Sequence, residues 1–127
     1  MNPDAPARAT VLVVEDEDSI RTIIQLALET KGYRLLTASD SAEGLRIAQS
    51  YDGPIDLVIS DMLLPGVNGS ELIRRLLVIR PEVHVIYISG YLGNETDLPA
   101  GQIGKTRFLP KPFTPSQLLE AVRAVFA

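Results

Sequence analysis

Short runs of consecutive apolar residues alternate along this chain with longer segments in which apolar residues recur every three or four positions. The runs are rich in β-branched residues, which favours strands buried on both faces. They occupy residues 11–14, 35–38, 57–59, 85–88 and, with a weaker pattern, 108–109. Strands that alternate with helices predict a parallel sheet with helices on both of its faces.

The longer segments carry the periodicity of amphipathic helices, with one apolar face. Their apolar residues lie within positions 20–28, 42–48, 72–77 and 118–126. Asn68, with Glu71 three residues later, predicts the N-terminal cap of the third segment, and Thr114 with Gln117 predicts that of the last. Right-handed crossovers between strands then give a single doubly wound, flavodoxin-like (βα)5 domain of the α/β class, with strand order 2-1-3-4-5.

One stretch, from Gly90 to Thr106, lacks this alternation. It contains four glycines and Pro99 between the fourth and fifth predicted strands. Because glycine and proline disfavour helix interiors, this stretch predicts either a short or irregular fourth helix or a long surface loop.

The composition limits both the size of the domain and its chemistry. A chain of 127 residues, 46% of them hydrophobic, is large enough for one domain with its own core. The absence of cysteine excludes thiolate chemistry, and a net charge of −4 with dispersed basic residues argues against nucleic-acid binding. No apolar run reaches the roughly 20 residues of a membrane-spanning helix. We expect a linker or tail over residues 1–9, a domain over 10–127 and a cytoplasmic location.

Four consecutive acids, Glu15 to Asp18, follow the first predicted strand. A solvated helix start explains Glu17 and Asp18, with Asp18 or Ser19 as the capping residue. It explains Glu15 and Asp16 less well, because they directly follow a buried strand. Two carboxylates held together have raised pKa values unless a cation neutralises them.

Asp61 ends the third predicted strand, which lies next to the first in a sheet of order 2-1-3-4-5. The three carboxylates of Glu15, Asp16 and Asp61 should therefore converge at one edge of the sheet. A few carboxylates with open coordination positions suit Mg²⁺ and an incoming phosphate.

Ser89 and Lys111 follow the fourth and fifth predicted strands. Taken singly, the serine fits a turn and the lysine fits a solvated surface charge. Together with the acids, they supply a hydroxyl and an ammonium group that can donate to phosphate oxygens. The pattern indicates a phosphoryl-binding cleft in which an aspartate attacks phosphorus in line as the nucleophile.

Four segments carry a resemblance to a known family. They are Val11–Glu17, Ser60–Gly69, Ser89–Tyr91 and Lys111–Phe113. In order and spacing they resemble the opening, the phosphoacceptor loop, the switch-hydroxyl segment and the lysine motif of response-regulator receiver domains of two-component systems. The resemblance covers roughly residues 10–127, and four motifs in register are more specific than any one alone.

The resemblance implies a role for each acidic position. Asp61 resembles the phosphoacceptor, Asp16 the direct Mg²⁺ ligand, and Glu15 the acid that holds the ion through water. The backbone carbonyl of Leu63 would be the third protein ligand. The implied function is acceptance of a phosphoryl group from a histidine kinase or a histidine phosphotransfer protein, which then switches a partner surface. Such a domain catalyses only its own phosphorylation and slow autodephosphorylation, so it is not an enzyme in the usual sense.

The resemblance also implies a switch. Ser89 resembles the hydroxyl that turns toward the phosphoryl group, and Lys111 resembles the lysine that binds it, commonly before a cis proline. Phe108 stands at the aromatic switch position, where the family often has tyrosine, so no hydroxyl reports its rotation. An ordinary buried strand residue is an equal interpretation of Phe108.

Two further departures from the family lead to hypotheses. Leu63 is apolar where some members carry a polar side chain, and Tyr91 is bulky, so we expect slow hydrolysis of the phosphorylated state. The glycine-rich stretch 90–106 argues against dimerisation through the fourth helix. It is more similar to receivers attached to hybrid histidine kinases, and the chain could belong to such a longer kinase.

Three alternative functions fit the sequence less well. A haloacid-dehalogenase-type phosphatase would use Asp16 as nucleophile and Asp18 as acid, but Ile20 departs from its motif and the chain is short for that family. A flavodoxin-like cofactor binder would place a flavin phosphate against four acids, which would repel it. An unphosphorylated pseudo-receiver scaffold is disfavoured because every acceptor residue is present.

Overall fold

The computed structural model describes residues 9–62, 68–89 and 106–126. Five parallel strands form one sheet in the order β2-β1-β3-β4-β5, which confirms the predicted topology. The strands are β1 (Thr10–Val14), β2 (Arg34–Ala38), β3 (Leu57–Asp61), β4 (His84–Ser89) and β5 (Thr106–Pro110). The sheet therefore has β2 and β5 at its two edges.

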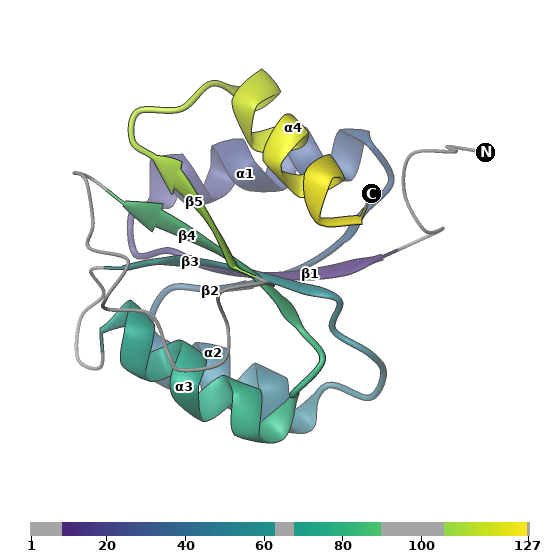
Figure 1. Ribbon diagram of the computed structural model, residues 1–127, viewed down its shortest axis with the longest axis vertical. Helices are drawn as coiled ribbons and strands as arrows, with labels where there is room; N and C mark the ends of the chain where they lie inside the picture. Colours follow the sequence, from purple (N-terminus) through teal and green to yellow (C-terminus); the bar gives the residue numbers. More distant parts are fainter. Residues whose placement is uncertain (1–8, 63–67, 90–105, 127) are drawn as a thin grey trace.

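Helices cover both faces of the sheet (Figure 1). The described helices are α1 (Asp18–Thr30), α2 (Ser41–Ser50), α3 (Gly69–Ile79) and α4 (Pro115–Phe126). The pair α1 and α4 lies on one face, and the pair α2 and α3 lies on the other. The helix or loop expected over 90–106 falls almost wholly outside the described residues, so the label α4 belongs to the helix that follows β5. Within the described ranges, no helix is both long enough and apolar enough to span a bilayer.

Burial of the central strands on both faces of the sheet explains why their sequences are continuously apolar. Every residue of β1 is buried, with Val11 and Val13 in the core under α1 and α4. Leu12 and Val14 belong to the core on the opposite face, under α2 and α3. A strand covered on both sides has no face toward water, so apolar residues are favoured at every position. Each fully buried Val or Leu side chain stabilises the fold by about 1.5–3 kcal/mol.

Two helix starts follow the predicted capping chemistry. The Asn68 side chain accepts a hydrogen bond from the Glu71 amide at 3.0 Å. At the start of α4, the Thr114 hydroxyl accepts from the Gln117 amide at 3.1 Å, and the Gln117 side chain accepts from the Thr114 amide at 2.8 Å. The second arrangement is a reciprocal capping box.

The start of α1 differs from the prediction. Asp18 is the first helical residue, and Glu17 precedes the helix without a side-chain capping bond, so the expectation that Asp18 or Ser19 caps α1 was wrong. The Asp18 carboxylate instead pairs with the Arg21 guanidinium one turn later. Residues three apart share a helix face, and this contact draws the carboxylate away from the helix amides.

Arg80 ties together the edge of the sheet where β3 and β4 begin. Its guanidinium donates to the carbonyl oxygens of Ala48 at 3.0 Å and Tyr51 at 2.7 Å, and to that of Gly53. These carbonyls lie at the end of α2 and in the loop before β3. One side chain therefore fixes a loop on the side of the sheet opposite to the carboxyl ends of its strands.

Candidate functional site

The acidic residues converge because β1 and β3 are neighbours, with Val14 paired to Ser60. One carboxylate oxygen from each of Glu15, Asp16 and Asp61 lies within 4.8 Å of the others. Glu15 and Asp61 are 0% and 4% exposed, whereas Asp16 faces solvent. The fold thus brings together the three carboxylates that the sequence pointed to, at the point where the strand order reverses.

Glu15 is held rigidly at the base of this cluster. Its amide donates to the Ala38 carbonyl of β2 at 3.0 Å, so the backbone of Glu15 extends the sheet pairing. Its Oε2 accepts from the Glu17 amide at 3.0 Å. Its Oε1 is buried and has no hydrogen-bond partner among the described residues. A buried carboxylate oxygen without a partner is costly, and a bound cation would satisfy it.

The electrostatics of Glu15 agree with a cation site. Burial raises the pKa of Glu15 to about 7, and the negative charge of Asp61 adds to this rise. The hydrogen bond from the Glu17 amide and the charge of Lys111 act in the opposite direction without cancelling it. Protons and a metal ion would therefore compete for this carboxylate near neutral pH.

Lys111 reaches the cluster from the loop after β5. Its Nζ lies 2.7 Å from Asp61 Oδ2, 3.6 Å from Glu15 Oε1 and 3.5 Å from Glu17 Oε1. The peptide bond between Lys111 and Pro112 is cis. Burial lowers the pKa of Lys111, but the hydrogen bond to Asp61 and the surrounding carboxylates outweigh burial and raise it overall. Lys111 is therefore a charged ammonium group that lies against the buried aspartate.

Gly69 allows the chain to return close to Asp61. A Cβ atom at this position would lie 2.3 Å from the Asp61 carbonyl oxygen and 2.7 Å from Met62 Cα. The Gly69 amide donates to the Met62 carbonyl at 2.9 Å, and the Met62 amide donates to the Ile88 carbonyl at 3.0 Å. A side chain at residue 69 would displace the backbone that carries Asp61.

Arg21 and Glu17 contribute to the site although the sequence did not single them out for it. Arg21 Nη1 donates to the Glu15 carbonyl at 2.8 Å, which fixes the turn between β1 and α1. Glu17 approaches Lys111 instead of serving only as an acid at a helix start. The spacing of Arg21 three residues after Asp18 was a usable signal for their pairing, but nothing in the sequence indicated the bond to the Glu15 carbonyl.

The remaining predicted positions are only partly placed. Ser89 is the last residue of β4 and pairs with Pro110, so its backbone is at the same edge of the sheet as Asp61, but its side chain lies outside the described parts. Leu63 and Tyr91 also lie outside them. Phe108 is half-buried, and its ring stacks on that of Tyr87 with centroids 5.6 Å apart.

Tyr87 is a second buried polar group near this edge. Its ring is fully buried under α2 and α3, its hydroxyl has no hydrogen-bond partner among the described residues, and burial raises the pKa of the phenol. The Tyr87–Phe108 stack therefore lies on the face of the sheet opposite to the core under α1 and α4.

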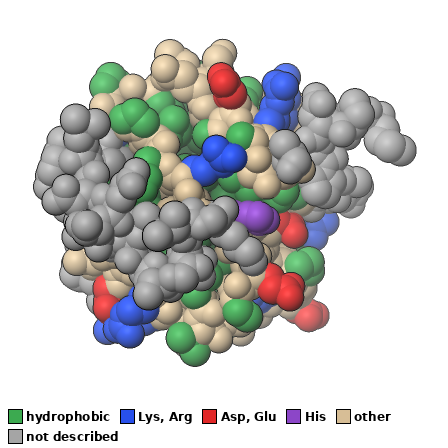
Figure 2. Space-filling model, viewed as in Figure 1, with side chains coloured by type: hydrophobic (Ala, Val, Ile, Leu, Met, Phe, Trp, Pro, Cys, Tyr) green, Lys and Arg blue, Asp and Glu red, His purple; other side chains and the backbone are tan. Residues whose placement is uncertain are grey.

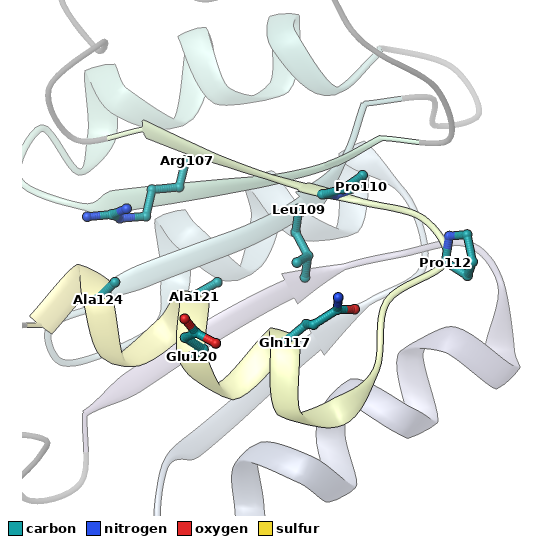
Figure 3. Close-up of a pocket in the computed structure, with 8 residues that line it drawn as sticks. All are labelled: Arg107, Leu109, Pro110, Pro112, Gln117, Glu120, Ala121 and Ala124. Carbon is teal, nitrogen blue, oxygen red and sulfur yellow. The ribbon is translucent and has the colours of Figure 1, made fainter.

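The surface also has a hollow that lies apart from the acidic cluster. A cavity of about 310 Å³ lies between β5 and α4, lined by Arg107, Leu109, Gln117 and Ala121 among others (Figure 3). It contains none of the clustered acids. On the face shown in Figure 2, the described Lys and Arg side chains are scattered among acidic and apolar ones and form no broad basic patch.

A doubly wound parallel sheet with clustered carboxylates and a lysine at the carboxyl ends of its strands defines a class of phosphate-handling α/β domains. The sequence model of the response regulator receiver domain matches residues 11–123. The chain belongs to this family, whose members work in two-component systems together with histidine kinases and generally bind Mg²⁺ through acidic residues.

Individual relatives agree with this assignment. The chain is 38% identical over 122 residues to the sensor kinase CckA of Brucella abortus (strain 2308), covering 94% of this chain and 13% of the kinase. A solved receiver domain of the hybrid histidine kinase CckA gives a TM-score of 0.79 at 36% identity, covering 94% of this chain and all of that one. The chemotaxis regulator CheY4 of Vibrio cholerae gives 0.81 at 30% identity, covering 93% and 98%. The chain spans about half or less of the length of the curated relatives it matches.

Proposed function

We propose that this domain accepts a phosphoryl group from phosphohistidine onto Asp61 in a Mg²⁺-dependent reaction, as one step of a two-component phosphorelay. The observation that carries the proposal is the contact between Lys111 and the buried Asp61 carboxylate, beside Glu15 and Asp16. A buried nucleophile with an ammonium donor and a cluster of acids suits phosphoryl transfer, which depends mainly on positioning and charge.

The residues fit a magnesium ion. The carboxylates of Asp16 and Asp61 would bind it directly, Glu15 would hold it through water, and the Leu63 carbonyl is the proposed third protein ligand. The buried Glu15 Oε1 supports this assignment, because it accepts no hydrogen bond from the described residues and its nearest cation, Lys111 Nζ, lies 3.6 Å away. When bound, Mg²⁺ supplies positive charge to the oxygens of the transferring phosphoryl group.

Asp61 and Lys111 would carry out the transfer itself. An Asp61 oxygen forms a bond to phosphorus while the bond from phosphorus to the histidine nitrogen breaks, and the nitrogen keeps the electron pair. Lys111, now bonded to Asp61 Oδ2, would donate to a phosphoryl oxygen as negative charge moves onto that group. The raised pKa of Lys111 supports its role as a permanent cation and not as a proton donor.

Ser89 and Phe108 are the proposed switch positions. In this proposal the Ser89 hydroxyl turns toward the new phosphoryl group, and Phe108 changes its rotamer in response. To do so, Phe108 would have to separate from the fully buried Tyr87 ring on which it stacks. The apolar Leu63 and the bulky Tyr91 remain the reason to expect a long-lived phosphorylated state.

The proposed donor is a histidine kinase or a histidine phosphotransfer protein. Similarity to the sensor kinase CckA supports a further proposal, that the domain belongs to a longer hybrid kinase, with residues 1–9 as a linker. In that arrangement the domain would receive its phosphoryl group within one polypeptide.

Intact mass measured after incubation with Mg²⁺ and acetyl phosphate tests the acceptor assignment. The parent should gain one phosphoryl group, and the gain should disappear in Asp61→Asn and with a chelator. A gain that survives Asp61→Asn but disappears in Asp16→Asn would favour the phosphatase alternative. In that alternative Asp18 would be the acid, whereas its carboxylate pairs with Arg21. The absence of any gain, even from a phosphohistidine protein, would favour the scaffold.

A further inference from the structure

Glu17 lies beside the acidic cluster and contacts Lys111. Its Oε1 lies 3.5 Å from Lys111 Nζ, and its side chain is 57% exposed. The next residue, Asp18, is 89% exposed and pairs with Arg21 instead. Two adjacent acids at the start of one helix therefore have different partners, and only Glu17 adds its charge to the site.

Lys111 is shared among more anions than it can neutralise. Its ammonium group lies within 3.6 Å of carboxylate oxygens from Asp61, Glu15 and Glu17. Asp16 adds a fourth carboxylate to the same cluster. With all four ionised, a divalent cation together with Lys111 would leave one net negative charge. That excess would be absent if residue 17 were neutral.

We propose that Glu17 selects the phosphodonor by its charge. It disfavours small, fully anionic acyl phosphates and favours donors whose leaving group is a nitrogen that carries or takes up a proton, such as phosphoramidate and phosphoimidazole. This inference rests on the proposed function of Asp61 as acceptor. In both donor classes a bond forms between an Asp61 oxygen and phosphorus. The bond from phosphorus to the leaving oxygen or nitrogen breaks, and the leaving atom keeps the electron pair.

The position of Glu17 gives its charge two effects on an anionic donor. An exposed carboxylate repels the donor on approach, and its contact with Lys111 competes with the phosphoryl oxygens for the same ammonium group. Both effects grow with the negative charge of the donor. A partly exposed charge a few ångströms from the reacting group should alter the rate about 3- to 10-fold, and salt should reduce the effect.

The test compares rates of phosphorylation of Asp61 in parent and Glu17→Gln by acetyl phosphate and by phosphoramidate, at saturating Mg²⁺ and at low and high ionic strength. Glutamine keeps the size of the side chain and the backbone amide that donates to Glu15. Asp18→Asn is the matched control, because it removes the same charge from the adjacent residue, which does not contact Lys111. Circular dichroism and Mg²⁺ titration verify that each variant folds and binds the ion.

The expected result is that Glu17→Gln raises the rate with acetyl phosphate about 3- to 10-fold and the rate with phosphoramidate by less, so that the ratio of the two rates changes. At high salt, the ratio of the rates with the two donors should become similar in the parent and in Glu17→Gln. Asp18→Asn should leave this ratio at the parent value. An equal change with both donors, or none, in a parent that is phosphorylated on Asp61 would overturn the inference alone. A parent that neither donor phosphorylates on Asp61 would overturn both the inference and the proposed function.

Discussion

Lys111 donates a hydrogen bond of 2.7 Å to Asp61, a residue 50 positions earlier in the chain, although Asp61 ends β3 and Lys111 follows β5, two strands that are not neighbours in the sheet. Strand β4 lies between β3 and β5, so Lys111 crosses over the end of β4 to reach its partner. In the metal-free protein the Lys111 ammonium group therefore lies beside the Asp61 carboxylate, which a bound cation would also approach.

Replacement of Lys111 by methionine should have opposite effects on metal binding and on phosphorylation. Loss of a positive charge beside the acids should tighten Mg²⁺ binding about 3- to 10-fold, because repulsion of the ion is removed. Loss of a donor to the phosphoryl oxygens should slow phosphorylation about 100- to 1,000-fold. Titration calorimetry and intact mass against time measure the two effects. Lys31→Met, at an exposed lysine that follows α1, is the control and should change neither.

Glu15 should make the stability of the metal-free protein depend on pH. Burial raises its pKa from 4.5 to about 7, so folding favours the protonated form. The stabilising contribution is complete below pH 4.5 and is lost as the pH rises through about 7. The loss should be on the order of 1–3 kcal/mol in free energy of unfolding.

Urea denaturation of parent and Glu15→Gln between pH 4 and 8, with chelator present, measures this effect. Glutamine resembles the protonated carboxyl, so the variant should gain stability relative to the parent as the pH rises. Adding Mg²⁺ should restore the parent at high pH and not the variant. Parallel stability curves for the two proteins would show that Glu15 titrates normally.

Gly69→Ala should disturb the site through the backbone. The added methyl group would lie 2.3 Å from the Asp61 carbonyl oxygen, and a backbone atom cannot move aside as a flexible side chain can. We expect a loss of about 1–3 kcal/mol in stability together with slower phosphorylation. Gly44→Ala is a matched control within α2, since its methyl group would meet only side-chain atoms, the nearest being a Val14 methyl at 3.0 Å. If both variants behave alike, the contact with Asp61 is not the cause.

The fold and the acidic cluster could be predicted from sequence because each depends on a local pattern. Apolar runs such as Val11–Val14 mark buried strands, and the order of strands in a doubly wound sheet brings Glu15 and Asp61 together. The caps at Asn68 and Thr114 follow from residue types at fixed spacing. These features need no knowledge of side-chain rotamers.

The contacts of Arg21, Glu17 and Tyr87 could not be predicted in the same way. Arg21 bonds to a backbone carbonyl, which every residue offers, so no sequence pattern marks the acceptor. Glu17 meets Lys111 across 94 positions of sequence. The prediction that Asp18 caps α1 was wrong for a similar reason. An aspartate at a helix start can bond either to the helix amides or to a nearby arginine, and the sequence does not show which.

Arg80 should support stability without affecting the site. Its three bonds to backbone carbonyls lie at the opposite side of the sheet, and Arg80→Ala should cost about 1.5–3 kcal/mol in free energy of unfolding. Arg80→Lys should recover only part of this, because lysine lacks the planar fork of donors. Phosphorylation rates measured well below the melting temperature should equal those of the parent. A slower rate in the folded variant would show that the two sides of the sheet are coupled.

The arrangement of the sheet distributes mechanical compliance unevenly around the site. The strands that lead to the acids, β1 and β3, are each paired with two neighbours, whereas β5, which leads to Lys111, is paired with β4 alone among the strands that the structure describes. A lateral displacement of the acids must disrupt two ladders, and a displacement of the lysine only one. If a change of charge at Asp61 causes a rearrangement, it therefore costs least free energy when Lys111 moves, together with β5 and α4 at that edge of the sheet.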